Sequence, residues 1–246
     1  MMRVFYLLFA VAAYFLFLAA FTYFALFVGN VPGLPITVDQ GGPSVNAGLA
    51  AIVDASLIVL FGLQHSIMAR PSFKAWWTQI VPPTIERSVY VLIATLLLIL
   101  LIFVWHPLPG VVWSIESSAA QTVLWVVFAT GWLMAVFSTF LINHFELMGL
   151  QQVWQNFRGS TPSEPKFRQP LLYRWSRHPL YLGMVIGLWC TPLMTVGHLL
   201  LAAGMTVYIL IGIRYEERDL VSIFGTEYTI YQEKIAMLIP WPKRNG

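Results

Sequence analysis

Two charged clusters in the last third of the chain hold the side chains best suited to chemistry. The first is Arg177-His178-Pro179, and the second covers residues 214–219. Uncharged residues fill positions 180–213 between them, with one interruption at 195–197. This pattern predicts a hydrophobic helical hairpin whose two ends lie close together on the same side of a membrane. Carboxylates, guanidiniums and an imidazole brought together in this way can hold a charged cofactor beside lipid.

Further polar residues stand at the ends of other apolar segments. Gln64-His65-Ser66 ends one segment, Glu86-Arg87-Ser88 begins another, and Asn143-His144-Phe145-Glu146 ends a third. Polar groups at membrane depth are costly unless they are paired or line a wet cavity. Their convergence with the two charged clusters therefore predicts one shared site that opens to the cytoplasm. The alternative is structural, since the Glu-Arg pair can cap a helix and the first histidine can bond a backbone carbonyl.

Motifs for metal, nucleotide or nucleophile chemistry are missing from the sequence. No two of the five histidines have the three- or four-residue spacing of a helical metal motif. We therefore predict no metal site, although His65, His144 and His178 could converge with Glu146. Neither a Walker A, a Gly-x-Gly-x-x-Gly nor a Gly-x-Ser-x-Gly motif is present. The single cysteine excludes an intramolecular disulfide.

Composition places the elements that carry these residues in a bilayer. The 246 residues are 58% hydrophobic and 10% charged, whereas soluble domains contain about 25% charged residues. A helix crosses the hydrocarbon core with about 20 apolar residues. We predict an all-α polytopic membrane protein with four full spans and a short transmembrane hairpin, five to six helices in all. The predicted spans are residues 4–28, 46–68, 89–105 and 120–142, followed by two hairpin arms of about 16 residues each.

This reading gives one domain over residues 1–246. Its N-terminal part, residues 1–143, contains four helices, and residues 171–240 form the hairpin and the C-terminal segment. All 14 lysines and arginines lie at the N-terminus, between spans two and three, between span four and the hairpin, or after the hairpin. The loops 29–45 and 106–119 contain none. The positive-inside rule therefore predicts an integral membrane protein with both termini cytoplasmic. Because the basic residues form no stripe, we expect no nucleic-acid partner.

The first cluster belongs to a run that is recognisable. Arg177-His178-Pro179-Leu180-Tyr181-Leu182-Gly183 resembles the Arg-His-Pro-x-Tyr-x-Gly element of the membrane methyltransferase superfamily, which includes isoprenylcysteine carboxyl methyltransferase and phospholipid methyltransferases. The second half of that element is matched by Glu216-Glu217-Arg218-Asp219-Leu220 and then Phe224-Gly225-Thr226-Glu227-Tyr228. The likeness covers residues 173–240. The ordered pair is far more specific than one Arg-His-Pro, and it implies a similar cofactor pocket on the cytoplasmic side.

The rest of the chain narrows this resemblance. The runs around Gln64-His65-Ser66, Glu86-Arg87-Ser88 and Asn143-His144-Phe145-Glu146 resemble the bacterial methanethiol S-methyltransferase family and its NnrU-like relatives. This implies S-adenosylmethionine as the methyl donor, methanethiol as the acceptor, dimethyl sulfide as the product, and a bacterial inner membrane. The alternatives are another acceptor, such as an isoprenyl-cysteine carboxylate or a lipid amine, or a non-enzymatic NnrU-like protein.

The resemblance also implies which residues bind the donor: Tyr173, Arg177, His178, Pro179, Tyr181, Gly183, Glu216, Glu217 and Tyr228. The donor carboxylate suits Arg177 and the helix N-terminus near Pro179, because helix N-termini attract anions. The two glutamates occupy adjacent positions, so only one of them needs to meet the ribose hydroxyls or the ammonium. Gly183 would allow the adenosine to approach closely. The tyrosines would stack on the base, or they belong to an interfacial aromatic belt.

Methyl transfer to a thiol requires a thiolate held in line with the sulfonium. His65 and His144 are the candidate bases, and Arg87 is the candidate cation for the thiolate. Glu146 completes the predicted catalytic set. Because His144 and Glu146 are two residues apart, we expect them to point in different directions on a helix.

Overall fold

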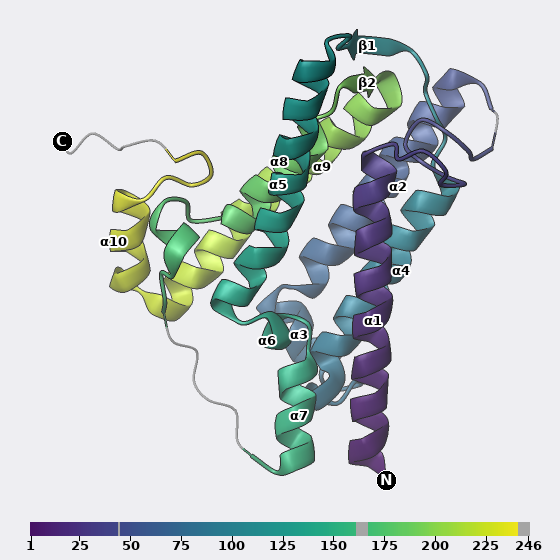
Figure 1. The fold of residues 1–246 in the computed structure, drawn as a ribbon. Helices are drawn as coiled ribbons and strands as arrows, with labels where there is room; N and C mark the ends of the chain where they lie inside the picture. The colour runs from purple at the N-terminus through teal and green to yellow at the C-terminus, as the bar shows by residue number, and fades with distance from the viewer. Residues whose placement is uncertain (44, 161–166, 241–246) are drawn as a thin grey trace. The chain divides into compact units, whose positions relative to one another are not determined.

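The computed structural model describes residues 1–43, 45–160 and 167–240 (Figure 1). The chain divides into two compact units that alternate along the sequence. Unit one comprises Met1–Ser114, His144–Ser163 and Leu193–Met205, and unit two comprises Ile115–Asn143, Glu164–Pro192 and Thr206–Gly246. The basic residues Lys166, Lys243 and Arg244 of the topology argument lie outside the described residues.

Helices dominate both units. Among the described residues, five helices are long and apolar enough to cross a membrane: α1 (Met2–Val28), α2 (Ala47–Met68), α4 (Pro83–Val104), α5 (Ser118–Ile142) and α9 (Val196–Phe224). This confirms an all-α integral membrane protein. The shorter helices are α3 (Pro71–Trp77), α6 (His144–Leu147), α7 (Leu150–Arg158), the 3-10 helix η1 (Leu171–Arg174), α8 (Pro179–Trp189) and α10 (Thr226–Lys234).

The long helices begin at residues suited to that position. The Asn46 side chain accepts a hydrogen bond from the Leu49 N–H and caps α2. Pro83 occupies the first turn of α4, where its missing N–H would have no intrahelical partner. At the other end of α5, Asn143 leaves the helical conformation with φ −170° and ψ 86°. This break separates α5 from α6 and places His144 on a new short helix.

Unit one is built around α4. The helices α1 and α2 both pack against it (Figure 1). Ala10, Ala13 and Ala20 form the buried side of α1, and their small side chains allow the helices to come close. Leu101 and Ile102 of α4 are almost wholly buried.

Two short strands in unit one were not predicted from the sequence. β1 (Val111–Ser114) pairs antiparallel with β2 (Leu193–Thr195), with Val111 opposite Thr195. The Val196 N–H continues the pairing to the Gly110 carbonyl at 2.7 Å. Runs of three and four residues are too short to show the alternation that marks a strand in a sequence. β2 interrupts the apolar stretch of residues 180–213 near the point where the sequence placed the turn of the hairpin.

The hairpin arms are unequal, whereas equal arms of about 16 residues were expected. α8 has 11 residues and α9 has 29. At 1.5 Å per residue α8 is about 17 Å long, which is less than the hydrocarbon core of about 30 Å. α9 continues through the charged cluster 214–219, because that cluster contains no glycine or proline to stop it. The helix ends only before Gly225, whose φ of 56° suits a glycine.

In unit two, α5 and α8 pack together through glycines (Figure 1). A Cβ on Gly183 would lie 2.5 Å from the Gly131 carbonyl oxygen and 2.6 Å from the Ala135 nitrogen. No side chain larger than hydrogen fits at this contact. Helix packing therefore explains why position 183 is a glycine, and the close approach of an adenosine there stays a prediction.

Candidate functional site: a polar cradle at the ends of the hairpin

The two charged ends of the hairpin meet within unit two, as the sequence predicted. His178 Nε2 lies 3.0 Å from Glu217 Oε1, and the Arg177 guanidinium donates to the same oxygen at 2.6 Å. Pro179 occupies the first turn of α8, again as expected. Polar residues at the start of α8, near the end of α9 and in α10 therefore form one cluster. We call this cluster the cradle: Arg177, His178, Tyr181, Glu216, Glu217 and Gln232.

The Arg177 side chain is largely enclosed and donates three hydrogen bonds within this cluster. Its side chain is 8% exposed. Besides the bond to Glu217, its Nη1 donates to the carbonyl oxygens of Gln232 at 2.9 Å and Ile235 at 2.6 Å. The guanidinium therefore joins α9 to α10 and to the residue after it. The expected contact between Arg177 and the carboxylate of a cofactor stays a prediction.

The adjacent glutamates have different surroundings. Both oxygens of Glu217 accept hydrogen bonds, Oε1 from Arg177 and His178 and Oε2 from Gln232 at 2.9 Å. Its side chain is 13% exposed. The Glu216 side chain is 41% exposed and accepts from the Tyr181 hydroxyl at 2.8 Å, with His178 Nδ1 at 4.0 Å. Neighbouring positions on a helix point about 100° apart, so one carboxylate is enclosed and the other is open.

The main chain also ties the C-terminal segment to the start of α8. The N–H of Arg177 donates to the Ala236 carbonyl at 2.9 Å, and the N–H of His178 donates to that of Met237 at 3.2 Å. The Ser176 hydroxyl adds a bond to the Met237 carbonyl at 3.3 Å. The chain reaches this position because it reverses at Gly225 between α9 and α10. The segment after α10 is thus an integral part of the cradle's wall.

Three buried tyrosines lie next to the cradle, two on α10 and one on η1. The Tyr231 hydroxyl donates to the Tyr173 carbonyl at 2.5 Å, and the Tyr173 hydroxyl donates to the Ser138 carbonyl at 3.4 Å. Tyr228 packs edge-on against Tyr231 and Phe167. Burial raises the pKa of Tyr231 to about 12 and also raises that of Tyr173 and Tyr228. All three are therefore neutral hydrogen-bond donors at physiological pH, and their burial excludes an exposed aromatic belt at these positions.

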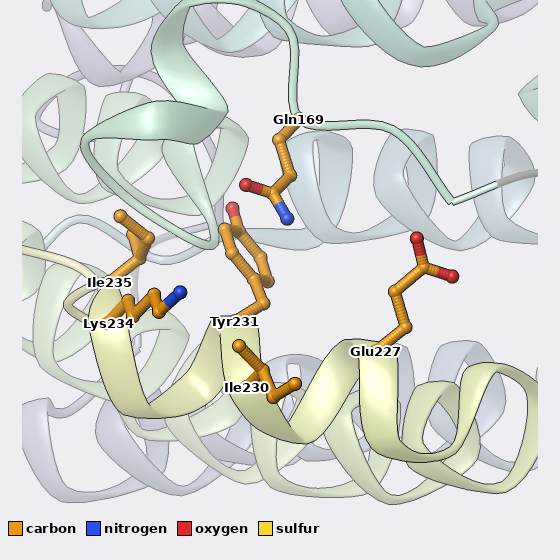
Figure 2. A pocket seen from close by; sticks show the side chains of 6 residues that line it. All are labelled: Gln169, Glu227, Ile230, Tyr231, Lys234 and Ile235. Carbon is orange, nitrogen blue, oxygen red and sulfur yellow. The ribbon is translucent and has the colours of Figure 1, made fainter.

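A pocket of about 210 Å³ lies beside Tyr231 (Figure 2). Figure 2 shows the Gln169 side chain reaching down towards the Tyr231 ring, with Glu227 and Lys234 on either flank. The residues that line the pocket are Gln169, Glu227, Ile230, Tyr231, Lys234 and Ile235. The Ile235 carbonyl also accepts a hydrogen bond from Arg177 of the cradle, so the pocket adjoins the wall that the C-terminal segment forms.

The predicted catalytic residues all lie in unit one. His65 stacks on Phe61 at 5.4 Å and lies 5.1 Å from the Tyr90 ring. The Arg87 guanidinium lies 4.8 Å above the same Tyr90 ring, and its Nε donates to the Leu147 carbonyl at 2.7 Å. Tyr90 therefore lies beside both His65 and Arg87, and their part in one shared site with the hairpin ends stays a prediction.

His144 and Glu146 point in different directions, as their spacing predicted. His144 is 4% exposed, and its Nε2 lies 2.9 Å from the Tyr14 hydroxyl of α1. Glu146 is exposed. Burial lowers the pKa of His144, which keeps its ring neutral near pH 7. Within the part of the chain that the structure describes, no group of three or more His, Cys, Asp or Glu residues could hold a metal ion.

Sequence reasoning missed several members of the site. Gln232 fixes the second oxygen of Glu217, Ser176 holds the segment after α10, and Phe167 packs on the tyrosines. The one available signal was position, because Gln232 follows directly after the Glu-Tyr-x-x-Tyr run that ends at Tyr231.

These features define the class of the molecule: an integral membrane protein of apolar helices with a charged cradle where the two arms of a helical hairpin end. The family model described as NnrU protein matches residues 55–238. The chain is 46% identical over 245 residues to the methanethiol S-methyltransferase of Mycobacterium tuberculosis, covering 100% of both chains. It is 48% identical over 236 residues to methanethiol S-methyltransferase 1 of Bradyrhizobium diazoefficiens, covering 95% of this chain and 81% of the relative.

A more distant relative is Nurim of Sus scrofa, which is 32% identical over 220 residues and covers 81% of each chain. No solved structure matches this chain. The chain belongs to the NnrU family and, at these identities, to the family of the methanethiol S-methyltransferases.

Proposed function

We propose that the protein is an S-adenosylmethionine-dependent thiol S-methyltransferase that converts methanethiol to dimethyl sulfide. The observation that carries this proposal is the open carboxylate of Glu216, placed beside Tyr181 and His178 at the end of the hairpin. Identities of 43–48% to relatives named methanethiol S-methyltransferase support the choice of acceptor.

The cradle's donor and acceptor groups fit the charges of this methyl donor. S-adenosylmethionine carries a sulfonium and an ammonium, and the open carboxylate of Glu216 can meet either cation. Its carboxylate suits the N-terminus of α8, because helix N-termini attract anions. Tyr181, which already donates to Glu216, keeps that carboxylate oriented towards the ligand.

The reaction is an in-line displacement. The thiolate sulfur attacks the donor's methyl carbon while the bond from that carbon to the sulfonium breaks, which gives dimethyl sulfide and S-adenosylhomocysteine. A free thiol with a reference pKa of about 8.5 is mostly protonated at pH 7, so a base must take its proton. We assign this task to His65 or His144 and the stabilisation of the thiolate to Arg87, with Glu146 as a further polar group. Burial disfavours the protonated form of His144, so its ring would be a weaker base than a free imidazole.

The proposed location is the bacterial inner membrane, with both termini and the hairpin ends on the cytoplasmic side. The clustering of basic residues supports this orientation, and the five apolar helices supply the spans. A cytoplasmic cradle gives the charged donor access from water. The neutral thiol and its apolar product can enter and leave through the lipid.

The test is turnover by the full chain, purified and reconstituted in nanodiscs. S-adenosylmethionine and methanethiol are supplied together, and dimethyl sulfide is measured in the headspace. We expect product from the wild type and at most a residual amount from Glu216→Gln. Parallel reactions with methyl-labelled donor offer an isoprenyl-cysteine or a lipid amine. Label on one of these but not on methanethiol would refute the acceptor, and a folded protein that binds no donor would refute the enzyme.

A further inference from the structure

We infer that Arg177, Glu217 and Gln232 form a latch that holds the C-terminal segment in place, whereas Glu216 alone provides the carboxylate for the donor's cation. The assignment of Glu216 rests on the proposed function, and the latch does not. Under this division, Glu217 and Arg177 are positioning residues that act through the wall of the cradle. A motif of two adjacent glutamates thus contains one ligand group and one structural group.

The surroundings of Glu217 leave little room for a ligand cation. Three donors converge on its two oxygens: Arg177 Nε at 2.6 Å, His178 Nε2 at 3.0 Å and Gln232 Nε2 at 2.9 Å. The side chain is also nearly enclosed, at 13% exposed. Its negative charge is balanced at contact distance by the Arg177 guanidinium. These three donors use most of the roughly four acceptor directions of the carboxylate, and charge-assisted bonds are among the stronger hydrogen bonds in proteins.

Arg177 links three separate stretches of the chain. Its Nε reaches Glu217 on α9, and its Nη1 reaches the carbonyls of Gln232 in α10 and Ile235 just after it. The planar fork of a guanidinium can satisfy these directions together, which a lysine ammonium cannot do with the same geometry. The main-chain bonds from Arg177 to Ala236 and from His178 to Met237 run beside this fork. The latch and these two bonds therefore hold the same segment.

Glu216 differs in both charge balance and access. Its recorded partners are the neutral Tyr181 hydroxyl at 2.8 Å and His178 Nδ1 at 4.0 Å, and its side chain is 41% exposed. Arg177 and Glu217 pair with each other, so the carboxylate of Glu216 is the acidic group of the cradle that Arg177 does not contact. A ligand cation can pair with it. The ring of His178 contacts both glutamates, so the latch fixes the ring that borders the open carboxylate.

This division predicts that two neighbouring substitutions of the same kind have different consequences. Glu216→Gln should weaken S-adenosylmethionine binding by about tenfold or more and leave the C-terminal segment as tightly held as before. Glu217→Gln should loosen that segment, which raises the KM for the donor more than it lowers kcat. Arg177→Lys should behave like Glu217→Gln, because it keeps the charge and loses the fork.

The experiment uses the full chain in nanodiscs with two measurements on each variant. Calorimetry gives the affinity for S-adenosylmethionine, and hydrogen exchange follows the amides of Arg177 and His178, which bond to Ala236 and Met237. We expect Glu217→Gln and Arg177→Lys to speed exchange at these amides by about tenfold and Glu216→Gln to leave it unchanged. Glu233→Gln, a matched change at an exposed residue of α10, should alter neither measurement.

A milder variant covers the case in which Glu217→Gln does not fold. Gln232→Ala keeps both charges and removes a single donor, so it should fold and still speed exchange at the same two amides. Unchanged exchange in Gln232→Ala and Glu217→Gln would overturn the latch, as would faster exchange in Glu216→Gln. A wild type that binds no donor would overturn the proposed function and the assignment of Glu216, while the exchange rates would still decide whether the latch exists.

Discussion

Two carboxylate–histidine pairs, one in each unit, have different surroundings in the structure. In unit one, Asp54 of α2 accepts hydrogen bonds from the His106 N–H at 3.0 Å and from its Nδ1 at 3.3 Å, and Asp54 is 0% exposed. In unit two, His178 stands between an enclosed glutamate and an open one. The first pair fastens α2 to the segment after α4. The difference between the two pairs is therefore one of access, because only the second has an exposed carboxylate beside it.

The largest expected effect is the loss of stability caused by Asp54→Ala in unit one, with no change in donor binding. Asp54→Ala leaves the His106 main-chain and ring groups without their acceptor in a buried place. Breaking a buried pair in this way costs about 3 to 5 kcal/mol. Thermal unfolding in detergent should show a large fall in the midpoint, while the folded fraction keeps its donor affinity. Loss of donor affinity without loss of stability would make Asp54 part of the site and end the contrast.

The counterpart in unit two is Glu216→Gln. We expect kcat/KM for the donor to fall about 100-fold, since a charged contact worth about 1.5 to 3 kcal/mol is removed. The unfolding midpoint should stay within a degree or so of the wild type, because a 41% exposed side chain contributes little to packing. A strongly destabilised Glu216→Gln would mean that this glutamate, too, is a fastener.

The glycine contact between α5 and α8 sharpens the role of position 183. In Gly183→Ala the new methyl group would meet the Gly131 carbonyl and the Ala135 nitrogen at 2.5 and 2.6 Å. We expect a loss of about 1 to 3 kcal/mol from overpacking, measured as a lower unfolding midpoint. Normal stability together with weakened binding of an adenosine analogue would instead support the close approach of the cofactor.

A smaller effect is expected at the hydroxyl that orients the open carboxylate. Tyr181→Phe removes the 2.8 Å bond to Glu216 and keeps the ring. A hydrogen bond of this kind is worth about 0.5 to 1.5 kcal/mol, so the KM for the donor should rise about three- to tenfold. Steady-state kinetics at saturating methanethiol give this value. Tyr215→Phe, which changes the residue just before Glu216 on α9, provides a matched control. Equal effects in the two variants would remove Tyr181 from the cradle.

The smallest effect is a pH dependence of stability at His144. Burial lowers its pKa in the folded state below the ordinary value of about 6.5. The unfolded chain therefore binds more protons than the folded chain below that value, so the stabilising contribution is present above about pH 6.5 and is lost as the pH falls. Unfolding midpoints at pH 7.5 and 5.5 should differ more in the wild type than in His144→Gln. An equal difference in both proteins would show that His144 does not contribute.

The meeting of the hairpin ends was predictable, because the basic residues fix which ends share a side and the uncharged stretch fixes the reversal between them. The engagement of Arg177 was not, since two of its acceptors are main-chain carbonyls of Gln232 and Ile235, which any residue carries. Which of the two glutamates is enclosed and which is open depends on the rotation of α9 about its axis. The sequence predicted only that one of the two needs to meet a ligand. β1 and β2 are too short to show a pattern, and the length of α9 was missed because charge was taken as a stop signal.

The central claim, that the cradle of unit two holds the methyl donor, is tested most directly by photocrosslinking. Protein in nanodiscs is irradiated with methyl-labelled S-adenosylmethionine, digested, and mapped by mass spectrometry. We predict label on peptides that contain residues 176–183 or 214–232, removed by excess S-adenosylhomocysteine and reduced in Glu216→Gln. Label that is competed away but maps only to other parts of the chain would contradict the account.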